Sequence, residues 1–301
     1  MKTTSTFALL TAALTAGTLC FTSCGKPKAA DEQLMLTGYQ RESQSTLFRD
    51  NDTVSSTSTT AVAFCRDAKG RFYRYGTPGD DYNFSGEGDT LDFKLYWKKD
   101  TLSFSGRMAF NAQGNPVWNE DYPQGEYQFR FRKPYMGREL RTYSYDAQGR
   151  LTGMDWDSYE EETDTLIRTS YARIYWNAAG DVDSVFSYRL RNDSVMPFHV
   201  ERYFYSQGLQ AKLPLSLDQY VDPFYSFASP YLRTTHLPDS VATIYYYNGW
   251  DILETTGKKI SYTLDADHLV QEISTSGQNF RNGVVKSQYK TRYYGFTYEK
   301  Q

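Results

Sequence analysis

The sequence predicts an all-β protein, an antiparallel meander of hairpins that forms either a rolled sheet or an up-and-down barrel. Three observations favour this class. The 301 residues include 27 Tyr, 18 Phe and 5 Trp, and these side chains suit pleated, half-buried surfaces. Apolar and polar residues alternate over many short segments, as in Leu91-Asp92-Phe93-Lys94. About 14 such segments are separated by turn sequences, and strands adjacent in sequence usually pair.

Residues 1–23 have the features of a lipoprotein signal peptide. Lys2 precedes an apolar run from Phe7 to Phe21 that is too short for a helix spanning a bilayer. The run ends in Phe21-Thr22-Ser23-Cys24-Gly25, which resembles the lipobox of bacterial lipoproteins. The resemblance implies cleavage before Cys24 and lipidation of its thiol. We therefore expect a lipid anchor in the outer membrane, on either its periplasmic or its surface side; an ordinary secretory signal is the alternative.

Residues 24–60 read as the lipidated cysteine followed by a flexible tether. The segment contains few large apolar residues and ends in the Ser/Thr-rich tract 53–60, which offers little surface to bury. Leu34, Met35, Leu36 and Tyr39 are the residues from which an additional N-terminal strand could form. Residues 61–301 are predicted to form a single Tyr-rich β domain.

A turn motif, Asp or Asn followed by Ala, any residue and Gly, recurs along this domain. In such a turn the Asp or Asn side chain accepts backbone hydrogen bonds, and glycine adopts the left-handed conformation without steric cost. The motif predicts type I turns with a bulge between antiparallel strands. The four glycines concerned are Gly70, Gly114, Gly149 and Gly180.

The segment Tyr143 to Met154, YSYDAQGRLTGM, resembles the YD repeat of Rhs-type proteins, although the motifs here are spaced irregularly. Residues 61–301 are more similar to a domain of unknown function, described as porin-like, that is carried by a group of Bacteroidota lipoproteins. These proteins also combine a lipobox, a Ser/Thr-rich tether and Tyr-rich hairpins with such turns. That resemblance implies a porin-like β fold and an envelope location, and it supplies no catalytic residues. A transmembrane barrel is a rival interpretation. The ending Tyr298-Glu299-Lys300-Gln301 lacks the terminal aromatic residue typical of that class.

Asp followed by Ser or Thr and an aliphatic residue also recurs, and this pattern resembles the O-glycosylation acceptor of secreted Bacteroidota proteins. Thr53, within the predicted tether, is the strongest candidate for a glycan. The alternative is that each Asp ends a turn and the next two residues begin a strand.

The sequence offers no constellation for catalysis, a metal or a cofactor. A net charge of −3 argues against a nucleic-acid partner. His199, His236 and His268 have no metal-ligand spacing. The acidic residues between Asp155 and Asp164 read as a solvated hairpin loop. We expect a protein that is not an enzyme; a glycoside hydrolase is a distant alternative, because any β protein offers carboxylate pairs.

The surplus of aromatic residues is the remaining functional signal. Exposed Tyr and Trp side chains suit the surfaces of sugars and peptides. We therefore expect a non-catalytic binding module for a glycan or a protein partner. A structural or immunity-type envelope protein is the alternative, with Tyr merely packing both faces of the sheet. The residues selected as possible ligand-surface aromatics are Tyr245, Tyr246, Tyr247, Trp250, Tyr293 and Tyr294.

Overall fold

The computed structural model describes residues 34–49, 52–66, 72–76, 80–86, 88–97, 101–113, 115–123, 136–160, 162–191, 194–210, 236–247 and 251–300. The predicted signal peptide 1–23, Cys24, Gly70, Gly114 and Trp250 lie outside the described residues.

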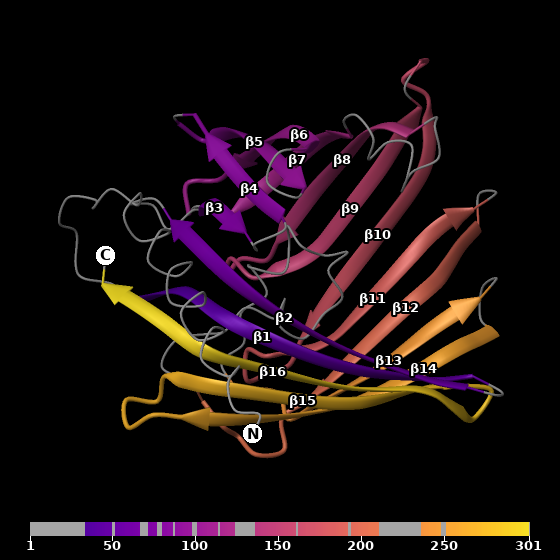
Figure 1. The fold of residues 1–301 in the computed structure, drawn as a ribbon. Coiled ribbons are helices and arrows are strands. Elements are labelled where there is room, and N and C mark those ends of the chain that lie inside the picture. The colour runs from indigo at the N-terminus through magenta and orange to yellow at the C-terminus, as the bar shows by residue number, and fades with distance from the viewer. Residues whose placement is uncertain are drawn as a thin grey trace, which may run out of the picture.

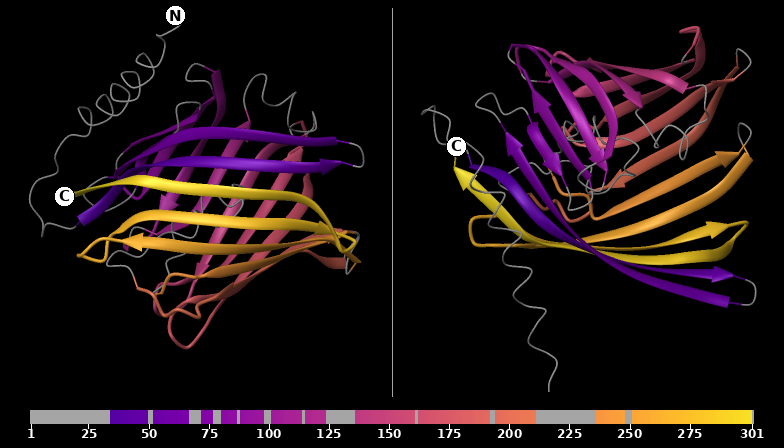
Figure 2. Two further views of the ribbon diagram at one scale, coloured as in Figure 1. Left: turned by 60° about the horizontal axis from the view of Figure 1, so that its bottom comes forward. Right: turned by 45° about the horizontal axis from the view of Figure 1, so that its top comes forward.

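The described residues form sixteen antiparallel strands that close into one barrel. Each strand pairs with its neighbours in sequence, and β1 also pairs with β16, from Leu34 opposite Lys300 to Leu47 opposite Ser287. Figure 1 shows the indigo β1 beside the yellow β16, and Figure 2 shows the same neighbours from two further sides. The predicted all-β meander is confirmed, and the pairing of its first and last strands makes it a closed up-and-down barrel.

The first eight strands are β1 (Leu34–Arg49), β2 (Asp52–Arg66), β3 (Phe72–Gly76), β4 (Asp80–Ser85), β5 (Thr90–Trp97), β6 (Thr101–Phe110), β7 (Pro116–Pro123) and β8 (Met136–Tyr145). The second eight are β9 (Leu151–Glu160), β10 (Leu166–Trp176), β11 (Val182–Arg191), β12 (Ser194–Phe204), β13 (Ser240–Tyr247), β14 (Asp251–Leu264), β15 (Val270–Arg281) and β16 (Val284–Lys300).

The N-terminal hairpin β1–β2 corrects the predicted tether and raises the number of strands above the expected 14. Residues 34–60 are part of the barrel wall. The Ser/Thr-rich tract is polar on both faces, but its side chains bond across the hairpin: Ser45 to Ser56 at 2.8 Å and Thr46 to Ser55 at 3.1 Å. β-Branched Thr also favours the extended backbone. Thr53 is exposed in β2 opposite Phe48, near the tip of this hairpin.

The barrel has two different ends because successive strands alternate in direction. We call the end that carries the connections β6–β7, β8–β9, β10–β11, β12–β13 and β14–β15 the turn end. The opposite end, with the tips of β1–β2, β9–β10, β11–β12, β13–β14 and β15–β16, is the hairpin end. The recurring turn motif therefore lies at one end of the molecule.

The turns at this end have the geometry that the motif predicts. The Asp146 carboxylate accepts hydrogen bonds from the backbone N–H groups of Gln148 and Arg150, and Asn177 does the same for its own turn. Gly149 and Gly180 have φ angles of 75° and 85°, in the left-handed region where a Cβ is disfavoured. A register shift between Ser144 and Tyr145 provides the bulge.

The aromatic residues near these turns have a role that the sequence does not reveal. Each donates a hydrogen bond to a backbone carbonyl at the start of the preceding odd-numbered strand or, in the case of Tyr262, to Pro238 just before that strand. The five ring-to-carbonyl bonds are Tyr145 to Pro116 (2.7 Å), Trp176 to Leu151 (2.8 Å), Tyr205 to Val182 (2.8 Å), Tyr262 to Pro238 (2.7 Å) and Tyr298 to Val270 (2.7 Å). Each bond links two adjacent strands at the turn end of the barrel.

The interior at the turn end is filled with apolar side chains. Leu151, Val182 and Val270, the first residues of β9, β11 and β15, are almost fully buried, and Ile273 and Phe296 pack with them. Side chains of β5 and β6 form a smaller apolar cluster, which consists of Leu91, Phe93, Met108 and Phe110. The core of this barrel therefore lies inside it: Val270, Ile273 and Thr275 of β15 and Ala172 and Ile174 of β10 all point inward.

Candidate functional site

An aromatic surface lies on the outside of β10 and β11. On β10, Ala172 and Ile174 point into the core, so Tyr171, Arg173 and Tyr175 point outward. On β11, Val185 is in the core, so its neighbours in the alternation, Phe186 and Tyr188, also face outward. We name the set Tyr171, Tyr175, Phe186, Tyr188 and Tyr246 the aromatic face.

Its rings form a continuous chain across the two strands. Tyr171 lies opposite Tyr188 in the strand register and stacks on it, with 5.0 Å between ring centroids. Phe186 stacks on Tyr188 at 6.4 Å, and Tyr175 meets Phe186 edge-on at 5.5 Å. These distances fall in or near the range of favourable aromatic pairs. Tyr175 is 51% exposed, so the chain of rings reaches solvent.

Charged and apolar groups border the aromatic face. The Arg173 guanidinium lies 4.7 Å from the Tyr171 ring centre and pairs with Asp155 at 2.7 Å. On the other side, Phe186 is followed in the same cross-strand row by Val200 of β12 and Ile244 of β13. The surface therefore combines ring faces with a paired cation and carboxylate.

Burial, followed by the nearby hydroxyls of Tyr175 and Tyr171, raises the pKa of the Tyr188 hydroxyl. The Arg173 charge acts in the opposite direction and does not overcome this increase. At neutral pH the Tyr188 hydroxyl is therefore protonated, and it can both donate and accept a hydrogen bond.

Of the six aromatic residues selected from the sequence, the structure describes the side chains of four, and it places them on both sides of the wall. Tyr246 contributes to the aromatic face, where its hydroxyl affects the pKa of Tyr188. Tyr245 points inward and stacks on His199 at 4.7 Å. Tyr293 is buried against Tyr39, whereas Tyr294 faces outward under Arg292.

Tyr247 belongs to β13, but its side chain, like Trp250, lies outside the described part of the structure. The other four members of the aromatic face were not selected from the sequence. Their signal is the alternation Tyr171-Ala172-Arg173-Ile174-Tyr175, in which small and aliphatic residues mark the core side.

The barrel interior above the apolar core contains two buried polar groups. In the first, Arg141 donates to Asp121 and to Glu139, each at 2.6 Å, and Ser158 also donates to Glu139. Asn119 accepts a hydrogen bond from the Tyr143 hydroxyl at 2.5 Å. The two carboxylates thus share one guanidinium, and breaking either pair would leave a buried charge without its partner.

In the second group, the hydroxyl of Tyr203 donates to Glu201 at 2.6 Å, and Nε2 of His199 lies 3.4 Å from the other oxygen of the same carboxylate. All three residues are buried. His199 therefore lies in a packed interior with Tyr245 against its ring.

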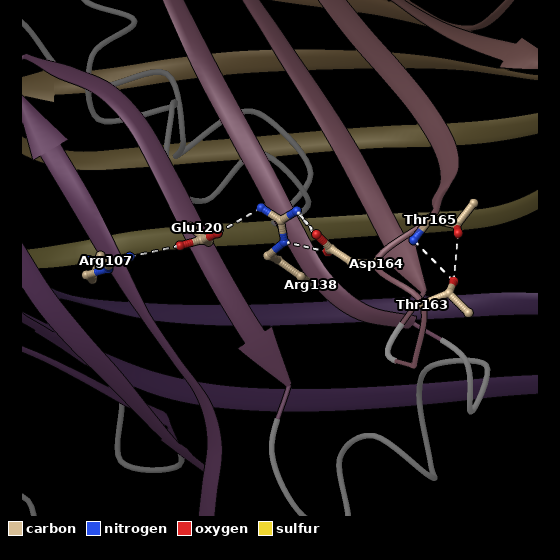
Figure 3. A network of polar contacts seen from close by, with 6 residues as sticks. All are labelled: Arg107, Glu120, Arg138, Thr163, Asp164 and Thr165. Carbon is tan, nitrogen blue, oxygen red and sulfur yellow. Dashed lines mark hydrogen bonds and ion pairs between the residues drawn. The ribbon is translucent and has the colours of Figure 1, made fainter.

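A chain of ion pairs crosses the outer face of β6 to β9 (Figure 3). Arg138 of β8 bonds to Glu120 of β7 at 2.9 Å and to both carboxylate oxygens of Asp164 at 2.9 and 3.0 Å. Arg107 of β6 contacts the other oxygen of Glu120 at 3.4 Å. Burial opposes ionisation of Glu120, but hydrogen bonds from Arg138, Tyr122 and Arg107 outweigh it and lower its pKa.

The structure also corrects part of the prediction that residues 155–164 form an acidic hairpin loop. Asp155 and Asp157 belong to β9, and only the short connection up to Thr165 links β9 to β10. Asp157 accepts a hydrogen bond from Thr169 across the hairpin at 2.7 Å. β9 extends through these acidic residues because Trp156 and Ser158, which alternate with them, point into the barrel; Ser158 is buried there and Trp156 is half-buried.

The described residues contain no group of three or more His, Cys, Asp or Glu side chains placed to hold a metal ion. Within the same residues, no helix has the length and hydrophobicity needed to cross a bilayer. The pKa is lowered for the carboxyl groups of Glu120, Asp146, Asp239 and Glu272.

Comparison with known proteins identifies the fold. A porin-like protein from Bacteroides vulgatus has a similar structure, with a TM-score of 0.52 and 15% identity over 82% of this chain and 96% of its own. A porin-like protein from Bacteroides uniformis gives a TM-score of 0.51 and 13% identity over 87% of this chain and 96% of its own. No protein-family model matches the sequence, and no curated protein matches it significantly. The porin-like fold implied by the sequence resemblance is confirmed.

Proposed function

We propose that this protein is a non-catalytic, lipid-anchored protein of the outer membrane that binds a glycan through the aromatic face. The observation that carries the proposal is the chain of four outward-facing rings from Tyr171 to Tyr175, with Tyr246 beside it. An unbroken row of rings on the outer side of a sheet contributes little to the core, which lies on the opposite side.

The chemistry of this surface suits a sugar. A pyranose ring has C–H groups on its faces and hydroxyl groups at its edge. The ring faces of Tyr175 and Tyr188 offer apolar contact to the former, and their hydroxyls offer hydrogen bonds to the latter. The paired Arg173 and Asp155 add a donor and an acceptor at the border.

The electrostatics support a binding role without catalysis. Hydrolysis of a glycosidic bond needs a carboxyl group that stays protonated near neutral pH, and hence a raised pKa. The carboxyl groups of Glu120, Asp146, Asp239 and Glu272 have lowered pKa values instead. Inside the barrel, Asp121 and Glu139 both pair with Arg141.

The anchor and the location rest on other observations. The lipobox-like ending at Cys24 supports lipidation, and the porin-like fold shared with Bacteroides proteins is compatible with an envelope location. A lipid-facing barrel needs an apolar outer band. The outer side here carries Arg107, Glu120 and Arg138 on one part of the wall, so attachment by a lipid is favoured over insertion of the barrel.

The test is binding of the full-length protein to a panel of neutral polysaccharides, measured by retardation in affinity gels. Tyr175→Ala and Tyr188→Ala should each weaken binding by roughly 2- to 12-fold, the value of one aromatic contact. Tyr122→Ala, which removes an exposed tyrosine from β7, is the matched control and should leave binding unchanged. Equal binding by the double variant Tyr175→Ala/Tyr188→Ala would refute the proposed site.

A protein partner is the competing outcome. In that case no polysaccharide in the panel would be retained, and a photo-crosslinker placed at Tyr171 would capture a defined envelope protein in intact cells. That result would replace the glycan with a protein at the same face.

A further inference from the structure

A groove lined mostly by polar and charged residues lies on the outside of the barrel, over β13, β14, β15, β16 and β1. It has a volume of about 600 Å³. Asp239 and Gln207, near the β12–β13 connection, border it on one side, and Glu42 and Gln44 of β1 border it on the other. It shares no residue with the aromatic face.

The strand register arranges the floor of the groove in two rows. Residues paired directly across neighbouring strands point to the same face of the sheet. The first row runs Gln44, Lys290, Ser276, Lys259 and Ser240 across five strands, and the second runs Glu42, Arg292, Ser274 and Ser261 across four. Ile260, Ile273 and Tyr293, which alternate with these residues, point into the core, so both rows face outward.

The charges in the two rows differ in how they are compensated. Arg292 bonds to Glu272 at 2.7 Å, and this hydrogen bond raises the pKa of Arg292 and lowers that of Glu272. Asp239 accepts hydrogen bonds from the Ser206 hydroxyl and the Gln207 backbone. Each of these charges therefore already has a partner within the protein.

The two lysines of the first row differ from Arg292, which has an ion-pair partner in Glu272. Neither Lys259 nor Lys290 makes an ion pair with any residue that the structure describes, and both side chains are exposed. They stand on β14 and β16, two strand spacings apart, roughly 9 to 10 Å between their backbones. The hydroxyl of Ser276 lies in the row between them. Because lysine stems are flexible, both ammonium groups can reach one anionic group placed over Ser276.

We propose that this groove binds an acidic polysaccharide, with a carboxylate or sulfate group of the sugar chain held between Lys259 and Lys290 over Ser276. Ser274 and Ser261 already donate to Glu272 and to the Ser274 carbonyl, and the Gln44 amide to Glu42, so their oxygen atoms accept hydrogen bonds from the sugar hydroxyls on either side. Glu42 and Asp239 at the borders repel a polymer that carries a charge on every unit. The ligand therefore carries acidic groups separated by neutral sugars, which distinguishes it from a nucleic acid.

The probe is a hyaluronan decasaccharide, in which acidic and neutral sugars alternate, and the measurement is calorimetric titration of the full-length protein. Wild type should bind it and should not bind the same oligosaccharide after its carboxyl groups are reduced to alcohols. Affinity should fall as salt is raised, because both ammonium groups are exposed and screened. The double variant Lys259→Gln/Lys290→Gln should bind roughly 2- to 30-fold more weakly, as expected for two exposed charge contacts.

Lys94→Gln on the outer side of β5 is the matched control and should bind like wild type. Exposed Lys to Gln changes have little effect on stability, and circular dichroism of each variant checks the fold. The proposal is overturned if the double variant binds hyaluronan as tightly as wild type does. It is equally overturned if wild type binds the reduced oligosaccharide as tightly as hyaluronan. It is also overturned if single-stranded DNA binds more tightly than hyaluronan, or if millimolar sulfate alone binds at Lys259 and Lys290 and hyaluronan does not.

The groove and the aromatic face are tested independently of each other, because each pair of substitutions should affect only one ligand. Tyr175→Ala/Tyr188→Ala should retain hyaluronan binding, and Lys259→Gln/Lys290→Gln should retain binding of the neutral polysaccharide.

Discussion

The five ring-to-carbonyl bonds at the turn end make a direct prediction about stability. Tyr205→Phe removes one hydroxyl and leaves the ring in place, so that apolar packing is unchanged. The lost bond is the one from Tyr205 to the carbonyl of Val182, 2.8 Å long. Val182 has no exposed surface, and water therefore has no access to replace the hydroxyl at that carbonyl.

The magnitude follows from this burial. Leaving a buried acceptor without its donor costs about 1–3 kcal/mol, whereas the net value of a hydrogen bond exchanged with water is about 0.5–1.5 kcal/mol. We expect Tyr205→Phe to lie in the upper range. For a chain of this size each kcal/mol lowers Tm by roughly 2–4 °C. Tyr145→Phe and Tyr298→Phe break equivalent bonds on other strand pairs, so the three effects should add.

The assay is urea and thermal unfolding of the purified full-length protein, followed by circular dichroism and tyrosine fluorescence. Tyr175→Phe is the control, because its side chain is 51% exposed and its hydroxyl is solvated; it should change the free energy of unfolding by less than about 0.5 kcal/mol. If Tyr205→Phe unfolds at the same urea concentration as Tyr175→Phe, the bonds at the turn end do not stabilise the barrel and the reasoning is wrong.

Three further predictions concern packing and pH. Gly106→Ala should lower stability by about 1–3 kcal/mol, because a Cβ there collides with the Glu120 carbonyl and the Phe93 ring, whereas Gly257→Ala, with nothing within 4 Å of the new Cβ, should be neutral or stabilising by up to about 1 kcal/mol. Urea unfolding that gives the two variants equal stability would contradict this. Ile273→Ala should cost about 2–5 kcal/mol, since its side chain is fully buried in the core; a cost below 1 kcal/mol would show that the site collapses freely. The Glu120 carboxylate has a lowered pKa in the folded state, so its ion pairs stabilise the protein above its ordinary pKa of 4.5, and this contribution disappears as pH falls through the lower folded value. The stability difference between wild type and Glu120→Gln should therefore be largest near pH 7 and shrink below pH 4.5, and a difference that is constant with pH would exclude the mechanism.

The sequence predicts the fold class well because the signals for it are local. Alternation at Leu91 and Phe93 identifies a strand and its inner face, and the turn at Asp146 needs only the residues up to Arg150. The N-terminal hairpin is missed because Ser and Thr fill both faces of β2, so no period of two appears. Its stability comes from pairing with β1, which is not a property of either segment alone.

The candidate sites are harder to predict because they depend on register. Tyr171 and Tyr188 are 17 positions apart in the sequence and meet only because Ala172 lies opposite Ser187. The consecutive tyrosines at 245 and 246 look like a cluster in the sequence, but the alternation of a strand sends them to opposite sides of the wall. Lys259, Ser276 and Lys290 come from three strands, and the sequence of no single strand indicates that the three residues share one groove.

The closure of the barrel by β1 and β16 also sets the order in which strand pairs form as the chain is made. Every other strand pair joins neighbours in sequence and can form as soon as the second strand is available. The closing pair joins Leu34 with Lys300, so it forms only after the entire chain has emerged. Until then β1 has an unpaired edge that can add strands from other chains. Completion of β16 is therefore the step that removes the open edge of β1, and a chain that ended before Val284 would keep two open edges, those of β1 and β15.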